Sequence, residues 1–140
     1  MCGPFKEKCF LWFSFGHKLH VYDESGNEVA FIQQKVMSFL PKFFIYINGQ
    51  EVTQIVKEFT FLKPSYRVDG MGWSLSGNFF QHDYILSSAE KTVMRVSKEW
   101  FTWGDSYSLD IADVEDALLC LCVVLAVDCV LEAERNRLTS

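Results

Sequence analysis

Proline and charge are both scarce in this chain, and their scarcity argues against a disordered protein. Three of the 140 residues are proline, 22% are charged and 16% are aromatic. Disordered chains combine low hydrophobicity with high net charge, whereas 49% of these residues are hydrophobic, enough to build a core. The length is typical of one domain, so we expect residues 1–140 to form a single domain.

A surplus of positive charge is also missing, which argues against nucleic-acid binding. The formal net charge is −5, and all of it arises from Asp110 onward, where seven acids face two bases. Acids and bases balance in residues 1–109, so no broad basic surface is available to grip a phosphate backbone. We therefore expect no nucleic-acid partner.

The chain lacks the motifs of common enzymes and metal sites. It contains no glycine-rich phosphate loop, no G-x-S-x-G or H-E-x-x-H element and no C-x-x-C pair. His17 and His20 would point to opposite faces of a strand. Cys120 and Cys122 would lie about 200° apart on a helix, so neither pair can easily share an ion. We expect no catalytic residue, no metal and no cofactor.

The five cysteines do not form a disulfide pattern. Their number is odd, and Cys120, Cys122 and Cys129 fall within one helical run. Residues 1–8 lack the apolar run of a secretory signal. Both observations favour a cytoplasmic protein whose helical thiols are reduced and act as small hydrophobic side chains.

What the chain does have is a succession of short amphipathic segments joined by turns. Residues 17–34 predict a hairpin, because segments of strand-forming residues flank a polar turn. Residues 43–57 predict a second hairpin around Asn48-Gly49, a strong turn signal. Further strands are expected at residues 65–69, 72–77, 83–86, 91–98 and 106–111. The total is about ten antiparallel strands.

One hydrophobic helix follows the strands. Asp113 suits its N-cap and Arg135 its C-terminal end, so we expect the helix over about residues 113–134. Residues 117–131 contain one polar side chain, Asp128, so the helix has no solvent-exposed face. A transmembrane span is the alternative, but it needs roughly 20 apolar residues and Asp128 interrupts the run. The chain is therefore predicted to be mainly β, an antiparallel β-barrel that encloses a hydrophobic C-terminal α-helix.

Several blocks of the sequence occur together in a familiar order. They are G-H-K-L-H-V-Y-D-E-S-G-N-E-V-A-F-I-Q-Q-K, S-F-L-P-K-F-F-I-Y-I-N-G-Q-E-V, F-T-F-L-K-P-S-Y, W-F-T-W-G-D-S-Y-S-L-D-I-A-D and D-A-L-L-C-L-C-V-V-L-A-V-D. With these blocks, residues 13–131 resemble the bacterial LURP-one-related (YxjI-like) family of the tubby C-terminal-like superfamily. The resemblance implies a barrel around a central helix, in agreement with the residue patterns.

The resemblance also implies a departure at the N-terminus. Family members usually carry a further N-terminal hairpin before the block that begins here at Phe13, and residues 1–11 are short for two strands and a turn. We therefore expect an incomplete barrel with an open edge. An open edge exposes backbone donors and acceptors, which predicts self-association or a partner chain that fills the gap.

Two sets of residues are candidates for function. Tubby-like domains are linked with phosphoinositide headgroups, so the resemblance makes basic residues weak candidates for headgroup binding: Lys35, Lys42, Lys57, Lys63, Arg67, Arg95 and Lys98. Scattered solubilising charges are the other interpretation. Asp128 is costly in an apolar helix unless it is paired, and we expect it to bond donors of the barrel wall. We expect His82 and Asp83 to be an exposed polar pair at a strand start.

The leading hypothesis is a non-enzymatic binding or scaffold domain, since a barrel filled by its own helix has no large internal pocket. One alternative is a peripheral membrane domain that binds phospholipid or phosphoinositide headgroups. The other is an enzyme with a surface cleft around Asp128 or His82.

Overall fold

The structure is a computed structural model of the chain. It describes the backbone of residues 11–15, 18–35, 40–58, 65–101 and 104–139. Within these ranges it describes the side chains of residues 18–35, 40–58, 65–97 and 108–136.

The described chain is mainly β and ends in one long helix, as the sequence predicts. The strands are β1 (Leu11–Phe15), β2 (Lys18–Tyr22), β3 (Glu28–Gln34), β4 (Lys42–Ile47), β5 (Gln50–Glu58), β6 (Ser65–Val68), β7 (Trp73–Asn78), β8 (Asp83–Ser87), β9 (Thr92–Phe101) and β10 (Gly104–Ile111). They form one antiparallel sheet in the order β1 to β10, and each strand pairs with its neighbours in sequence. A 3-10 turn, η1 (Val114–Asp116), precedes the helix α1 (Ala117–Thr139).

Local turn chemistry forms the hairpins where it was expected. Asn48 (φ 51°) and Gly49 (φ 79°) both lie in the left-handed region, the geometry of the tightest hairpin turns. Before β3, the Asp23 carboxylate accepts hydrogen bonds from the backbone N–H groups of Ser25 and Asn27, both at 2.9 Å. Polar turn residues thus reverse the chain at the predicted places.

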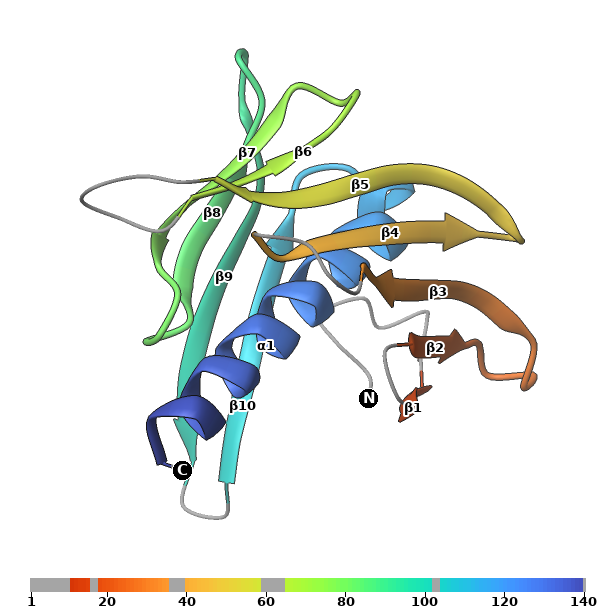
Figure 1. Ribbon diagram of the computed structural model, residues 1–140. Helices are drawn as coiled ribbons and strands as arrows, with labels where there is room; N and C mark the ends of the chain where they lie inside the picture. The colour runs from red at the N-terminus through yellow and green to blue at the C-terminus, as the bar shows by residue number, and fades with distance from the viewer. Residues whose placement is uncertain (1–10, 16–17, 36–39, 59–64, 102–103, 140) are drawn as a thin grey trace.

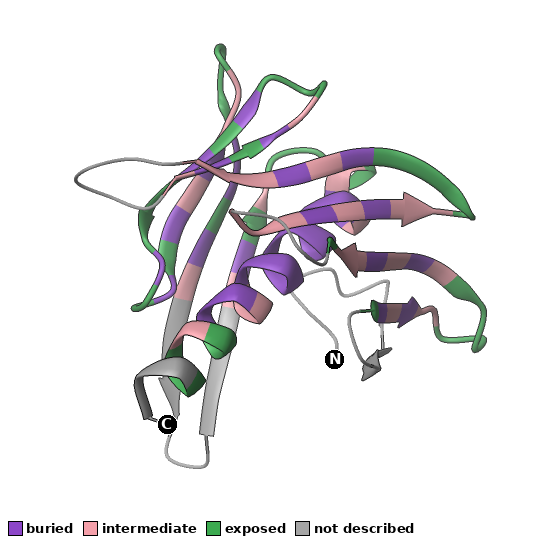
Figure 2. Cartoon of the chain, in the orientation of Figure 1, coloured by how far each residue is buried: buried purple, intermediate pink, exposed green. Residues whose placement is uncertain are grey.

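The core lies between the inner face of the sheet and α1. Side chains alternate along the strands: in β2, Leu19 and Val21 are buried, whereas Lys18 is exposed and His20 is half-buried. From Ala117 to Leu131 the helix is buried on nearly every side. Figure 2 shows this continuous buried surface on α1 and the buried positions of the strands that bend around it. The all-round apolar helix is therefore covered by protein.

The closed barrel is not confirmed, because the sheet of the described residues is open. Its strand order is linear, and in the part of the chain that the structure describes β1 pairs with β2 alone and β10 with β9 alone. Figure 1 shows the sheet curving around α1 without joining its two ends. From Ala117 to Leu131 the helix is nearly all buried although the sheet of the described residues is open, so helix burial by itself does not establish closure.

The start of the helix also differs from the prediction. Asp113 makes no side-chain cap, and η1 separates it from α1, which begins at Ala117 and continues past residue 134 to Thr139. The reason is a competing partner, since the Asp113 carboxylate is paired with Lys91 at the end of the β8–β9 connection.

Candidate functional site

The outer face of β2, β3 and β4 carries a stripe of aromatic rings. His20 and Phe31 are paired across β2 and β3, and Phe31 and Tyr46 across β3 and β4. The rings of Phe31 and Tyr46 are stacked, with centroids 4.2 Å apart and planes at 10°. His20 lies 6.2 Å from Phe31 and 6.5 Å from Tyr22, centroid to centroid. These half-buried rings point away from the core because their neighbours in each strand face α1.

Three lysines lie at one end of this stripe. The backbone N–H of Lys35 donates to the carbonyl of Lys42 (2.8 Å), so the two residues stand opposite each other where β3 ends and β4 begins. Lys18, the first residue of β2, pairs with Gln33 in the same part of the sheet. The Nζ atoms of Lys18 and Lys42 each lie 5.8 Å from a ring centroid, of Phe31 and Phe44 respectively. We call Lys18, His20, Tyr22, Phe31, Lys35, Lys42, Phe44 and Tyr46 the outer patch.

The lysines of the outer patch differ from the other described bases in their carboxylate partners. Lys18, Lys35 and Lys42 make no ion pair with any residue whose side chain is described. Like charges directly across a strand pair repel each other. A bound anion would therefore reduce the repulsion between the lysines of the outer patch.

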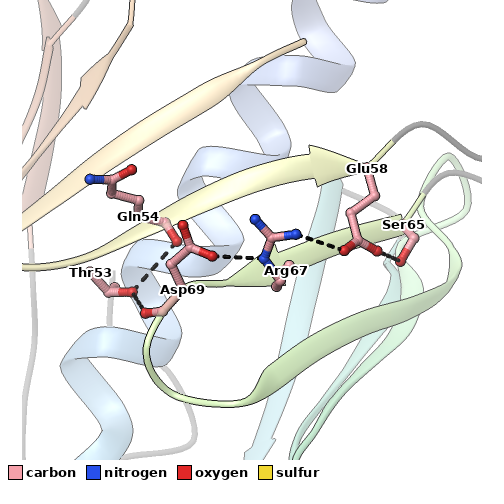
Figure 3. A network of polar contacts seen from close by, with 6 residues as sticks. All are labelled: Thr53, Gln54, Glu58, Ser65, Arg67 and Asp69. Carbon is pink, nitrogen blue, oxygen red and sulfur yellow. Dashed lines mark hydrogen bonds and ion pairs between the residues drawn. The ribbon is translucent and has the colours of Figure 1, made fainter.

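The other predicted headgroup residues do not join this patch. Lys57 turns toward the helix and pairs with Glu134. The Arg67 guanidinium donates to Asp69 (Nε to Oδ1, 2.7 Å) and to Glu58 (Nη1 to Oε1, 3.1 Å), as Figure 3 shows. Arg95 Nη2 lies 3.6 Å from Asp83 Oδ1. Lys63 and the side chain of Lys98 lie outside the described residues.

The network around Arg67 is a structural one. Thr53 Oγ1 donates to the Asp69 carbonyl (2.5 Å), and the Asp69 N–H donates to the Gln54 carbonyl (2.8 Å). Figure 3 shows these contacts joining the edges of β5 and β6. Arg67 is therefore engaged in holding two strands together, and its charge is offset by two carboxylates.

A second polar feature lies inside the molecule, between the β7–β8 turn and α1. His82 is buried, with 6% of its surface exposed, and its backbone is in the left-handed region at φ 53°. Its Nδ1 lies 3.7 Å from Oδ1 of Asp128. That carboxylate oxygen is buried and has no hydrogen-bond partner among the described residues. The expectation of an exposed His82 is wrong, whereas Asp83 beside it is exposed.

Burial raises the pKa of Asp128 to about 6. The nearby Glu132 adds to this increase, and Arg135 opposes it. Asp128 was predicted to bond donors of the surrounding wall; the wall places His82 near it, but at 3.7 Å the contact is not a hydrogen bond. The sequence offers no local signal for this partner, because the left-handed turn that directs His82 inward is not encoded by a glycine.

The helical cysteines are poor nucleophiles. Burial raises the pKa of Cys120 and of Cys122 to about 12 and that of Cys129 to about 11. All three thiols are therefore protonated at neutral pH, as expected for side chains that act as small hydrophobes. No cluster of three or more histidine, cysteine, aspartate or glutamate residues suited to a metal ion occurs in the described part of the chain.

The structure also bears on the transmembrane alternative. Among the described residues, no helix combines the length and the apolar character that crossing a membrane requires. 

Comparison with known proteins gives two matches. The family model of LURP-one-related proteins matches residues 5–128 of this chain. The chain is also similar to the uncharacterized protein YxjI of Bacillus subtilis strain 168, with 40% identity over 120 residues that cover 86% of this chain and 74% of the relative. No solved structure matches significantly.

Proposed function

The chain belongs to the LURP-one-related family, and we propose that it is a non-enzymatic binding domain that acts through its outer surface. The inner face of the sheet is occupied by the chain's own helix, which fills the space where a small molecule would otherwise bind. An enzyme centred on Asp128 or His82 would need both side chains to reach substrate. The 6% exposure of His82 argues against that alternative.

The binding surface is the outer patch, and its partner is an anionic phospholipid membrane. The observation that carries this proposal is the gathering of Lys18, Lys35 and Lys42, each without a carboxylate partner among the described residues, beside aromatic rings. Lysines attract anionic headgroups, and tyrosine and other amphipathic rings favour the depth of the headgroups.

The expected affinity is modest. Each lysine near an anionic surface contributes about 1 kcal/mol, so three lysines contribute about 3 kcal/mol before any contribution of the rings. The net charge of −5 opposes the attraction, so binding should depend strongly on salt and on orientation. The acids that produce this charge all lie from Asp110 onward, outside the strands that carry the outer patch.

Vesicle flotation tests the proposal. The protein should float with vesicles that contain phosphatidylserine at low salt, and it should stay behind with pure phosphatidylcholine vesicles or at high salt. The triple variant Lys18→Gln, Lys35→Gln, Lys42→Gln should lose this binding.

A matched triple variant keeps the test specific. Arg67→Gln, Lys91→Gln and Arg95→Gln together remove the same charge from exposed positions outside the outer patch. This control should still bind. Equal loss in both variants would mean that net charge alone governs binding, and no flotation of the wild type at low salt would refute the membrane proposal.

Closure of the sheet into a barrel is also part of the proposal. A closed barrel would need further strand pairing between the edges of β1 and β10, from residues outside the described part of the chain or from a second copy. Size exclusion with light scattering tests self-association through these edges.

A further inference from the structure

We propose that the pair of His20 and Glu28 makes membrane binding by the outer patch depend on pH, with tighter binding at acidic pH. The inference rests on the proposed function and adds the regulation of the same site. With the imidazole protonated, the pair has no net charge. Without that proton, it leaves one negative charge beside the lysines. The pair therefore changes the charge of the binding surface by one unit.

A β-bulge places Glu28 on the outer face of the sheet. The pairing of β3 with β2 moves from Ala30 directly to Glu28, which lies opposite Tyr22, so Val29 is an extra residue. One extra residue reverses the face to which the next residue of the strand points. Ala30 is accordingly buried and Glu28 exposed. An irregularity of the sheet thus brings the Glu28 carboxylate to Nδ1 of His20.

The pair lies among the groups that are proposed to contact the membrane. The centroid of the His20 ring is 6.2 Å from that of Phe31, and Lys18 Nζ is 5.8 Å from the same Phe31 centroid. The imidazole and the ammonium therefore flank one ring. Salt screens charges over about 10 Å at 0.1 M ionic strength, so the charge of the pair and that of Lys18 act on the same part of a membrane surface.

Both members of the pair can exchange protons with water. Their side chains are 29% and 40% exposed. Glu28 makes no other ion pair with the residues whose side chains are described. The ring neighbours of His20 are Tyr22 and Phe31. The proton of the imidazole therefore decides whether the Glu28 charge is offset.

The other titratable groups around His20 do not replace its proton. On β2, β3, β4 and the connections between them, the described ones are Lys18, Tyr22, Asp23, Glu24, Glu28, Lys35, Lys42 and Tyr46. On the other side of β2, the segment Leu11–Phe15 of β1 contains no titratable residue. The backbone N–H of Asn27 lowers the pKa of Asp23, which therefore stays ionised. Histidine is the side-chain type that changes its charge between about pH 5 and 8.

Vesicle flotation at a series of pH values tests the inference on the intact chain. The probe is phosphatidylglycerol vesicles at low salt, because their phosphodiester keeps its charge over the range of about pH 5–8 in which histidine titrates. The wild type should partition about fivefold more strongly at the acidic end of this range than at the basic end, the factor that one unit of charge near an anionic surface supplies.

Three variants assign the pH dependence. His20→Gln should stay at the weak binding of the basic end throughout, because Glu28 remains charged. Glu28→Gln should bind about fivefold more tightly than the wild type at the basic end and should still respond to pH through His20. Glu90→Gln removes the same charge from an exposed turn between β8 and β9, distant from β2 in the strand order. This control should bind like the wild type.

The outcomes separate the regulation from membrane binding itself. A wild type that binds equally at both ends of the pH range, or a dependence that persists unchanged in His20→Gln, would overturn the regulation and leave membrane binding in place. Weaker binding of Glu28→Gln than of the wild type would also overturn it. A wild type that does not float at any pH would refute membrane binding and its regulation together.

Discussion

Lys57 of β5 and Glu134 of α1 form an ion pair that joins positions 77 residues apart in the sequence. Their side chains are 20% and 22% exposed, so both charges are largely withdrawn from water. The pair attaches the later turns of the helix to the sheet beyond the apolar segment that ends at Leu131. It also explains why Lys57 does not belong to the outer patch, although its neighbours in sequence lie close to Lys42.

Breaking this pair should destabilise the protein. Glu134→Gln leaves the Lys57 ammonium without its partner in a half-buried place, and we expect a loss of about 1–3 kcal/mol in the free energy of unfolding. Urea unfolding of Glu134→Gln, Lys57→Gln and the double variant measures the coupling. The exposed pair of Lys91 and Asp113 is the control, and its double-mutant cycle should give less than about 1 kcal/mol. Additive losses in the first cycle would show that the two side chains are not coupled.

The stability of the protein should respond to the ionisation of Asp128. Folding raises the pKa of this carboxyl from 3.8 to about 6, so the folded state favours its neutral form. The stability that the neutral form contributes is fully present below pH 3.8 and is lost as the pH rises through about 6. Asp128→Asn should therefore be more stable than the wild type at pH 8, and the difference should shrink on acidification.

Screening by solvent reduces the expected difference in the free energy of unfolding between Asp128→Asn and the wild type. A shift of this size corresponds to roughly 3 kcal/mol, but the Asp128 side chain is 31% exposed, so we expect about 1–2 kcal/mol at pH 8. Denaturant unfolding at several pH values measures it. A variant that is less stable than the wild type at pH 8 would show that the charged form of Asp128 is the stabilising one.

Gly77 should be difficult to replace. Its φ is 137°, and an added Cβ would lie 2.6 Å from the Asp83 carbonyl oxygen and from the Cα of Tyr84. Both atoms belong to the backbone, so they cannot move aside as the end of a flexible side chain can. We expect Gly77→Ala to cost about 3 kcal/mol.

Gly72 provides the matched control for Gly77. It also has a positive φ, 67°, but no heavy atom lies within 4 Å of its added Cβ. Gly72→Ala should cost about 1 kcal/mol, the price of the backbone conformation alone. Equal thermal shifts for the two variants would show that the close approach to β8 is not rigid.

The features that follow from neighbouring residues could be predicted from the sequence. The Asn48-Gly49 hairpin and the strand alternation at Leu19 and Val21 need only local turn chemistry and a period of two. The helix was also predicted from neighbouring residues, namely an apolar run with charged residues at its ends. Its start was misplaced, because the Asp113 carboxylate is paired with Lys91 and does not cap the helix N-terminus.

The features that join distant residues could not be predicted. Asp128 was singled out as a costly acid, but its partner His82 depends on a left-handed backbone at a non-glycine residue. Lys35 and Lys42 were candidates among seven bases, and only the register of β3 and β4 shows that they face each other. Barrel closure was inferred from an apolar helix, but that helix is buried although the sheet of the described residues is open.

The edge of β10 predicts self-association. This strand is eight residues long, runs in unbroken register with β9 and contains neither lysine nor proline, the residues that commonly protect an edge. In the described part of the chain its other side has no strand partner. We expect size exclusion with light scattering to give a mass above 16.2 kDa that rises with concentration.

Ser108→Lys should lower this mass by placing a charge on the edge strand. Ser76→Lys in β7, an inner strand paired on both sides, is the matched control and should leave the mass unchanged. A wild type that stays monomeric at every concentration would mean that the edges are covered within one chain.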